Sequence, residues 1–168
     1  MDNDMTKNPF TITSAERTVD LKDAAALFRA YAASLRIDLA YQGFEAELAA
    51  LPGKYGPPSG VLLLARGENG APLGCVALRA LDSEGCCEMK RLYVAPAARG
   101  LGMGQALVDA VVSQAARIGY NEMLLDTLPT MAGALALYRK AGFNLINAYY
   151  DTPIAGTVFL AKRLSPLQ

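Results

Sequence analysis

Apolar residues recur three or four positions apart in several stretches of the chain, which is the spacing of one face of an α-helix. Asp20 precedes one such stretch as a predicted N-cap. Another stretch has polar residues four apart opposite an apolar face, and Gly119 follows it as a predicted C-cap. Helices are therefore predicted over Asp20 to about Asp38, Phe44 to Leu51, Gln105 to Ile118, and Thr130 to Gly142.

Short apolar runs bounded by turn residues predict β-strands. Asn69-Gly70 lies between two of these runs and is typical of a tight antiparallel hairpin. The stretch from Gly53 to Gly60 predicts an irregular connection, because it is short, rich in Gly and Pro, and flanked by apolar residues. Strands are predicted over Phe10 to Ala15, Val61 to Arg66, Leu73 to Ala80, Cys86 to Val94, Met123 to Thr127, Phe143 to Ala148, and Thr157 to Arg163.

The order of these elements predicts a mixed sheet. The strand, helix and strand between Cys86 and Thr127 form one crossover, which makes its two strands parallel, whereas the strands before it form an antiparallel meander. The fold class is therefore α+β, or α/β in three α/β/α layers. At 168 residues the chain fits a flexible tail over residues 1–9 and a single domain over residues 10–168.

Charge and hydropathy exclude several kinds of partner. Sixteen basic residues balance sixteen acidic ones without a basic stripe, so no nucleic acid partner is expected. The apolar runs are too short to span a membrane, so no membrane partner is expected either. The N-terminus is acidic and lacks a secretory signal, which predicts a cytoplasmic location. A small-molecule ligand fits this composition better.

The residues available for chemistry are limited. The chain has no histidine, which excludes Ser-His-Asp and Cys-His catalysis and histidine metal sites. Its cysteines, Cys75, Cys86 and Cys87, have neither a disulfide pattern nor a metal-ligand spacing, so they are expected to be small buried side chains and no metal is expected. Acid–base chemistry must use carboxylates, tyrosine, a thiol, lysine or water.

A glycine-rich run, Arg99-Gly100-Leu101-Gly102-Met103-Gly104, lies between a predicted strand and a predicted helix. Glycines at alternate positions leave backbone N–H groups accessible, and the helix dipole adds positive charge, so the run predicts a phosphate-binding loop. A nucleotide P-loop would need Lys-Ser or Lys-Thr where this chain has Gln105-Ala106. A dinucleotide fingerprint lacks its third glycine, although Asp126 mimics its ribose-binding acid; this hypothesis stays open as a minor alternative.

Two runs resemble the GNAT superfamily of acetyl-CoA-dependent N-acetyltransferases. Glu88 to Gly104 has the pattern of a strand ending in Val, a Pro-containing turn and Arg-x-x-Gly-x-Gly, and Ala134 to Phe143 has the pattern Ala-x-x-x-Tyr-x-x-x-Gly-Phe. The resemblance covers Val61 to Phe143 clearly and the flanks in outline. It implies a mixed, mostly antiparallel sheet of about six to seven strands, flanked by about four helices, with one parallel, splayed strand pair.

The resemblance also implies which residues bind acetyl-CoA as co-substrate. The pyrophosphate would rest on backbone amides of the glycine loop and the helix after it, and the pantetheine arm would lie along the backbone of one splayed strand. These residues are Leu92, Tyr93, Val94, Arg99, Gly100, Leu101, Gly102, Met103, Gly104 and Gln105. The superfamily frequently has Asn where this chain has Met131, so a cofactor contact at Met131 is expected to differ.

Two residues are the catalytic candidates. By resemblance, Tyr138 protonates the departing CoA thiolate, although it also lies on an apolar helix face where it could serve packing alone. Glu88 accepts the proton of the acceptor amine, directly or through water; the alternative is a strand carboxylate paired with Lys90 or a nearby Arg. Asp126 is a weaker candidate for the base.

The acceptor itself is not identified by the sequence. Several residues lie in regions that shape the acceptor pocket in the superfamily, and an ordinary packing or surface role is the alternative for each of them. These residues are Tyr31, Asp38, Tyr41, Phe44, Tyr149, Tyr150 and Asp151. The sequence thus predicts an N-acetyltransferase that acts on a primary amine of a small molecule or peptide by direct attack in a ternary complex. A non-catalytic acetyl-CoA-binding module is the alternative, and the resemblance also admits a homodimer.

Overall fold

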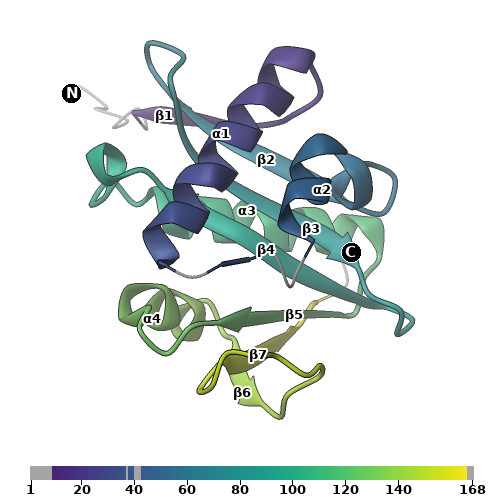
Figure 1. Ribbon diagram of the computed structural model, residues 1–168. Helices are drawn as coiled ribbons and strands as arrows, with labels where there is room; N and C mark the ends of the chain where they lie inside the picture. The colour runs from purple at the N-terminus through teal and green to yellow at the C-terminus, as the bar shows by residue number, and fades with distance from the viewer. Residues whose placement is uncertain (1–8, 37, 40–42, 166–168) are drawn as a thin grey trace, which may run out of the picture.

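A single mixed sheet of seven strands organises the computed structural model, which describes residues 9–36, 38–39 and 43–165 (Figure 1). The strand order is β1-β2-β3-β4-β5-β7-β6, and β4 and β5 form the parallel pair between otherwise antiparallel neighbours. This confirms the predicted sheet. The strands are β1 (Phe10–Ser14), β2 (Val61–Gly67), β3 (Pro72–Ala80), β4 (Cys86–Val94), β5 (Glu122–Thr127), β6 (Asn144–Ile146) and β7 (Val158–Arg163).

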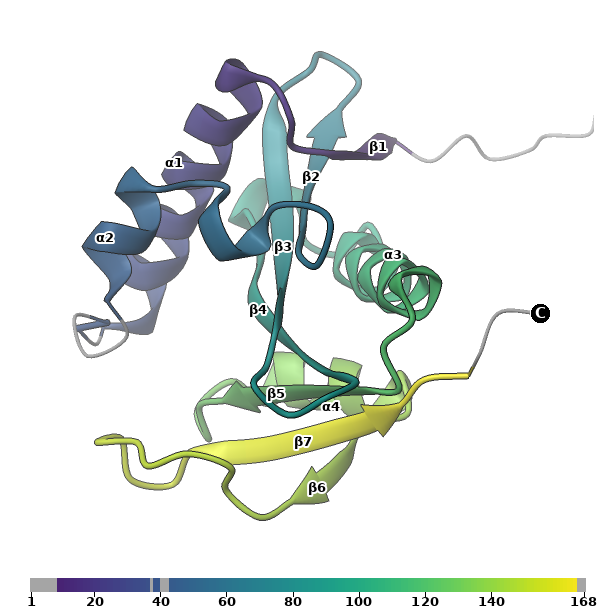
Figure 2. The ribbon, with the colours of Figure 1, turned by 90° about the vertical axis from the view of Figure 1, so that its right-hand side faces the viewer.

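Helices cover both faces of the sheet. One face carries the two helices that come first in the chain, and the opposite face carries the helix that connects β4 to β5 (Figure 2). The helices are α1 (Thr18–Leu35), α2 (Phe44–Ala49), α3 (Met103–Ile118) and α4 (Ala132–Lys140), with short 3-10 helices at Gly53–Tyr55 and Pro96–Ala98.

The alternation of side chains along β3 explains the two cores. Cys75 and Ala77 point to the α1 and α2 side, where they pack with Phe28. Val76 and Leu78 point the other way and belong to the cluster that includes α3. Each face of a strand thus buries every second residue, as the period of two requires.

Two predicted helix starts are wrong. Asp20 is not the N-cap of α1 but lies one turn inside it, where its carboxylate accepts hydrogen bonds from the backbone N–H groups of Glu16 and Arg17 and pairs with Arg66 at 2.7 Å. Asp20 thus accepts hydrogen bonds from unbonded N–H groups at the helix start, but it does so as the third residue of the helix and not as the N-cap. Thr130 does not cap α4; Met131 occupies that position.

Some boundaries also differ. Helix α1 ends at Leu35 rather than near Asp38, because Arg36 takes the left-handed backbone conformation that terminates a helix. The predicted tail falls outside the described residues except for Pro9. Among the helices of the described segments, none is long and apolar enough to cross a membrane.

Candidate functional site

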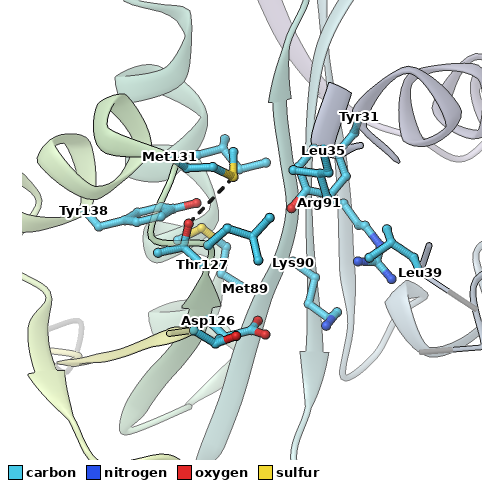
Figure 3. A pocket seen from close by; sticks show the side chains of 13 residues that line it. Tyr31, Leu35, Leu39, Met89, Lys90, Arg91, Asp126, Thr127, Met131 and Tyr138 are labelled. Atoms are coloured by element: carbon cyan, nitrogen blue, oxygen red, sulfur yellow. Dashed lines mark hydrogen bonds between the residues drawn. The ribbon is translucent and has the colours of Figure 1, made fainter. Parts of the chain in front are cut away.

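Strands β4 and β5 pair over a short distance and then diverge. Their parallel ladder runs from Cys86 opposite Glu122 to Glu88 opposite Leu124, after which the strands lead away from each other (Figure 2). The resulting hollow, which we name the strand-gap pocket, is shown in Figure 3. It is lined by Met89–Leu92 of β4, by Asp126–Leu128, Met131 and Tyr138 on the β5 and α4 side, by Tyr31, Leu35 and Leu39, and by Thr157.

A bulge in β4 faces this pocket. The register between β3 and β4 shifts between Cys75 and Ala77, and opposite that shift Arg91 has a φ of 61°. The extra residue breaks the alternation of the strand, and the side chain of Arg91 leaves β4 toward α2, where it pairs with Glu47. The β5-facing edge of β4 at this point has no strand partner among the described residues, because the parallel ladder with β5 ends at Glu88.

The glycine loop ends in a row of unbonded N–H groups. For each residue from Gly100 to Gln105, the backbone N–H has no acceptor among the described residues; the first helical bond runs from Ala106 to the carbonyl of Gly102. Gly100 and Gly102 have φ of 85° and 77°, a conformation that costs a residue with a Cβ. Helix α3 begins at Met103, slightly before the predicted Gln105.

The side chains of this loop have separate tasks. A Cβ on Gly104 would lie 3.2 Å from Leu137 of α4, so glycine allows α3 and α4 to approach closely. Met103 is buried in the core, which leaves only its backbone for a ligand, and Leu101 is half exposed. Arg99 donates from Nε to the carbonyl of Val94 at 3.2 Å, which ties the loop to the end of β4.

The loop fits a phosphate-bearing ligand. Helix N-terminal N–H groups that have no protein acceptor bind anions, and the dipole of α3 adds to the attraction. The amide oxygen of Gln105 is also buried without a partner in the part of the chain that the structure describes. Unsatisfied groups of both kinds at one place are expected where a polar ligand completes the site.

Tyr138 lies at the pocket with its hydroxyl directed into the gap (Figure 3). Its ring packs edge-on against Phe143 at 5.9 Å, so it serves the core as well. Burial raises the pKa of Tyr138 above its ordinary value, and the hydroxyl is protonated at neutral pH. No hydrogen bond to this hydroxyl occurs among residues 9–36, 38–39 and 43–165, so it is available to a ligand.

Other predicted cofactor residues lie along the same gap. Leu92 and Met131 line the pocket, and the hydroxyl of Thr127 lies 3.9 Å from the sulfur of Met131. An apolar thioether therefore stands where the superfamily frequently has an amide. The ring of Tyr93 packs edge-on against that of Tyr31, with centroids 6.2 Å apart. Only the backbone of Tyr93 is therefore left to contact a ligand.

Glu88 is almost completely buried and fully engaged. Its Oε1 accepts a hydrogen bond from Arg79 Nε at 2.8 Å and lies 3.8 Å from Lys90 Nζ; its Oε2 accepts from the hydroxyl of Tyr149 at 2.6 Å. Burial alone would raise the pKa of Glu88, but the charge of Lys90 and the hydrogen bonds from Tyr149 and Arg79 outweigh it, so the pKa is lowered. The predicted ion pair exists, and it weakens Glu88 as a base without removing it from the site.

Two consecutive tyrosines connect the diverging strands. Tyr149 donates to Glu88 of β4, and Tyr150 donates a short hydrogen bond to Asp126 of β5. Their rings contact each other at 5.5 Å, and both pack against Phe159 of β7. The loop before β7 thus spans the point where the gap opens.

A second hollow, of about 460 Å³, lies beside the first, and we name it the charged pocket. Lys90 lines both pockets and marks their junction. Burial lowers the pKa of Lys90, Glu88 and Asp126 act in the opposite direction, and Arg91 and Lys54 lower it further. The lining comprises Lys54, Arg79, Leu81, Asp82, Ser83, Glu88, Lys90, Tyr149, Tyr150 and Asp151.

Sequence reasoning missed Lys54 and Arg79. The predicted hairpin between β3 and β4 holds a signal for Arg79, because its register puts Arg79 opposite Glu88. Nothing local indicates Lys54, which reaches the pocket from the 3-10 helix after α2. Of the predicted acceptor residues, Tyr149, Tyr150 and Asp151 line the charged pocket and Tyr31 the strand-gap pocket.

The remaining candidates are placed elsewhere. Phe44 is buried beneath the guanidinium of Arg91 at 5.4 Å and belongs to the core. Asp38 is exposed, and Tyr41 lies outside the described residues. The cysteines are free thiols; Cys75 and Cys87 are buried as expected, whereas Cys86 is only partly buried. The described segments contain no cluster of acidic or Cys side chains that could hold a metal ion.

Comparisons with known proteins place this geometry in context. The model of the family described as "Acetyltransferase (GNAT) family" matches residues 24–143. A Schizosaccharomyces pombe protein named as an uncharacterized N-acetyltransferase is 40% identical over 161 residues, which cover 96% of this chain and 99% of that protein.

Solved structures share the fold. An acetyltransferase from Staphylococcus aureus aligns with a TM-score of 0.78 at 19% identity and covers 93% of this chain and 99% of its own. A putative acetyltransferase from Salmonella typhimurium, solved with its cofactor acetyl-CoA, aligns with a TM-score of 0.69 at 22% identity over 94% of this chain and 95% of its own.

Proposed function

The chain belongs to the acetyltransferase (GNAT) family and is an acyltransferase, and on that premise we propose that it transfers an acetyl group from acetyl-CoA to a primary amine. The acceptor is a small molecule or a peptide, and its nitrogen attacks directly while both substrates are bound. The observation that carries the proposal is the arrangement of three features along β4: the strand-gap pocket and the charged pocket, which share Lys90, and the unbonded N–H row that follows the end of the strand.

The backbone from Gly100 to Gln105 would hold the pyrophosphate of acetyl-CoA. Its N–H groups lack protein acceptors, and the N-terminus of α3 favours negative charge. Since the side chain of Met103 is buried in the core, the backbone rather than the side chain makes this contact. The pantetheine arm would then lie in the strand gap along Leu92, Tyr93 and Val94.

Bound acetyl-CoA supplies the acetyl thioester. A backbone N–H of the β4 bulge near Leu92 would donate a hydrogen bond to the thioester oxygen and stabilise the negative charge that develops there. When the nitrogen–carbon bond forms and the carbon–sulfur bond breaks, the hydroxyl of Tyr138 would give its proton to the leaving thiolate. The hydroxyl is protonated before the reaction, although the pKa raised by burial makes it a weaker acid.

The amine must lose a proton as it reacts, since an alkyl amine is mostly protonated near neutrality. Glu88 would accept this proton, directly or through water. Its lowered pKa keeps it ionised at neutral pH, and its Oε2 contacts the hydroxyl of Tyr149 at the wall of the charged pocket. The same lowered pKa makes Glu88 a weaker base, so the route through water is retained beside it.

Release of free CoA thiol, measured with a panel of primary amines, tests the proposal. The expected result is amine-dependent release together with an acetylated amine that is 42 Da heavier by mass spectrometry, a shift set by the exchange of hydrogen for acetyl. As a control, calorimetry measures whether the protein binds acetyl-CoA in the absence of an amine. Tight acetyl-CoA binding with no turnover on any amine would contradict the enzyme and favour the binding module.

A further inference from the structure

The charged pocket contains more positive than negative charge in its buried part. Arg79 and Lys90 line that part, Lys54 lies at its exposed edge, and Glu88 is the one carboxylate of the lining that is buried within the described residues. Asp82 and Asp151 also line it, but they are exposed on loops at its rim, where water screens them.

The carboxylates close to these cations are already shared. Glu88 is hydrogen-bonded to Arg79 and Tyr149, and Lys90 is a more distant partner at 3.8 Å. Lys54 Nζ lies 3.4 Å from Glu47, a carboxylate that Arg91 binds at 2.8 Å.

Across the gap, Asp126 accepts the hydroxyl of Tyr150. Arg79 and Lys90 therefore share Glu88, which is the one buried carboxylate of the lining among the described residues; Glu47 and Asp126 lie outside that lining. A half-buried excess of positive charge is stabilised by an anion in the hollow.

The guanidinium of Arg79 is positioned to bind such an anion. Its Nε is held by Glu88, and its side chain is 33% exposed. The two terminal nitrogens of its guanidinium make no hydrogen bond to any described residue, so they are open to the pocket. A guanidinium fixed in this way offers two parallel N–H groups, the geometry that binds a carboxylate bidentately.

We propose that the acceptor amine carries a carboxylate, which the terminal nitrogens of Arg79 bind and which Lys54 stabilises, so that the substrate is an amino acid or a similar small amino-carboxylate. This inference rests on the proposed function. Because Lys90 lines both pockets, a carboxylate held at Arg79 leaves the amine of the same molecule at the junction with the strand gap.

The anion is not a phosphate of the cofactor. The glycine loop follows the far end of β4, after Val94, whereas Arg79 and Glu88 face each other near the start of that strand. A volume of about 460 Å³ suits a small acceptor, and the rings of Tyr149 and Tyr150 form its apolar wall.

Matched pairs of amines test the proposal: glycine with glycinamide, β-alanine with β-alaninamide, and L-aspartate with its diamide. The value of kcat/KM is compared within each pair after correction for the fraction of free amine. The carboxylate member is expected to be preferred about 10-fold or more, since a charge-assisted hydrogen bond is lost with the amide. Equal or better use of the amides overturns the proposal and leaves the proposed function intact.

Two variants locate the contact. Arg79→Lys keeps the charge beside Glu88 but removes the bidentate geometry, and Lys54→Met removes a charge from a side chain that is 42% exposed. Within each pair, both are expected to raise the KM of the carboxylate by about 5-fold or more relative to the KM of the amide. Lys22→Met, at an exposed lysine of α1 outside the pocket, is the matched control. An equal effect on both members of a pair overturns the assignment.

Binding separates this inference from the proposed function. L-Aspartate is titrated calorimetrically into the protein in the presence of CoA. Binding that Lys54→Met weakens, without turnover on any amine, supports the carboxylate site and contradicts the transferase. Absence of both binding and preference overturns the carboxylate site.

Discussion

Arg91 Nε donates a hydrogen bond to Glu47 Oε2 at 2.8 Å, and each of the two side chains is only 3% exposed. Arg91 is the left-handed residue of the β4 bulge, and Glu47 belongs to α2. A second hydrogen bond joins Arg91 Nη2 to Glu47 Oε1 at 3.1 Å, and the hydroxyl of Tyr55 donates to the same oxygen. The pair thus anchors the β4 bulge, which faces the strand gap, to helix α2 outside the sheet.

Breaking this pair is expected to destabilise the fold. Glu47→Gln leaves the Arg91 charge buried with a neutral partner, so the free energy of unfolding should fall by about 3–5 kcal/mol in urea titration. The control is Glu45→Gln, since Glu45 is 81% exposed in its pair with Arg29 and should change stability by less than about 1 kcal/mol. Equal effects of the two substitutions would show that the buried pair is not special.

Acid should destabilise the protein through its buried carboxylates. Burial opposes ionisation of Glu47, but Arg91 and Tyr55 outweigh it, and the pKa of Glu47 is lowered in the folded state, as is that of Glu88. Their stabilisation is therefore complete above the unfolded value of about 4.3 and is lost as the pH falls through the lower folded pKa. Urea titrations between about pH 3 and pH 7 should show stability falling as the pH drops below the unfolded value, with a smaller slope in Glu47→Gln.

Removal of the Tyr138 hydroxyl should impair the chemical step. Tyr138→Phe keeps the ring contact with Phe143, so stability and acetyl-CoA affinity are expected to change little. Loss of a general acid should lower kcat by about 10²-fold or more. Tyr120→Phe provides the control, because that hydroxyl bonds the carbonyl of Ser59 away from both pockets. An unchanged kcat in Tyr138→Phe would assign this tyrosine to packing alone.

The pH profile of kcat/KM should reveal whether Glu88 accepts the amine proton. Tyr149→Phe removes a hydrogen bond that lowers the pKa of Glu88, so this pKa rises and activity on the acid side is lost at a higher pH than in the wild type. Glu88→Gln should lower kcat by about 10²-fold or more. Full activity in Glu88→Gln would instead identify water as the base.

Substitution at Gly102 should weaken acetyl-CoA binding specifically. Gly102 and Gly119 both have positive φ, at opposite ends of α3, and a Cβ at either position meets open space. Gly102→Ala and Gly119→Ala should therefore each lower stability by about 1–2 kcal/mol. Calorimetry should detect weaker acetyl-CoA binding only in Gly102→Ala, where the backbone before α3 is disturbed; equal affinities would argue against the loop as the pyrophosphate site.

Local patterns account for what was predicted from the sequence. The apolar periodicity identified each main helix and strand, and the glycine run indicated the loop with unbonded N–H groups ahead of α3. The errors at Asp20 and Thr130 concern single helix ends, where several nearby groups compete for the same unbonded N–H groups. Such competition is decided by small energy differences that a sequence pattern does not contain.

By itself, the sequence determined the order of elements, the crossover that makes β4 and β5 parallel, and the loop ahead of α3, because each depends on residues close together in the chain. Only the tertiary structure decided the charged pocket. Tyr149 and Glu88 are 61 positions apart, and Arg91 and Glu47 are 44 apart, yet each pair is in direct contact. Buried charges need partners, and the fold rather than the spacing along the chain supplies them, so the groups around the proposed acceptor site depend on packing across the sheet.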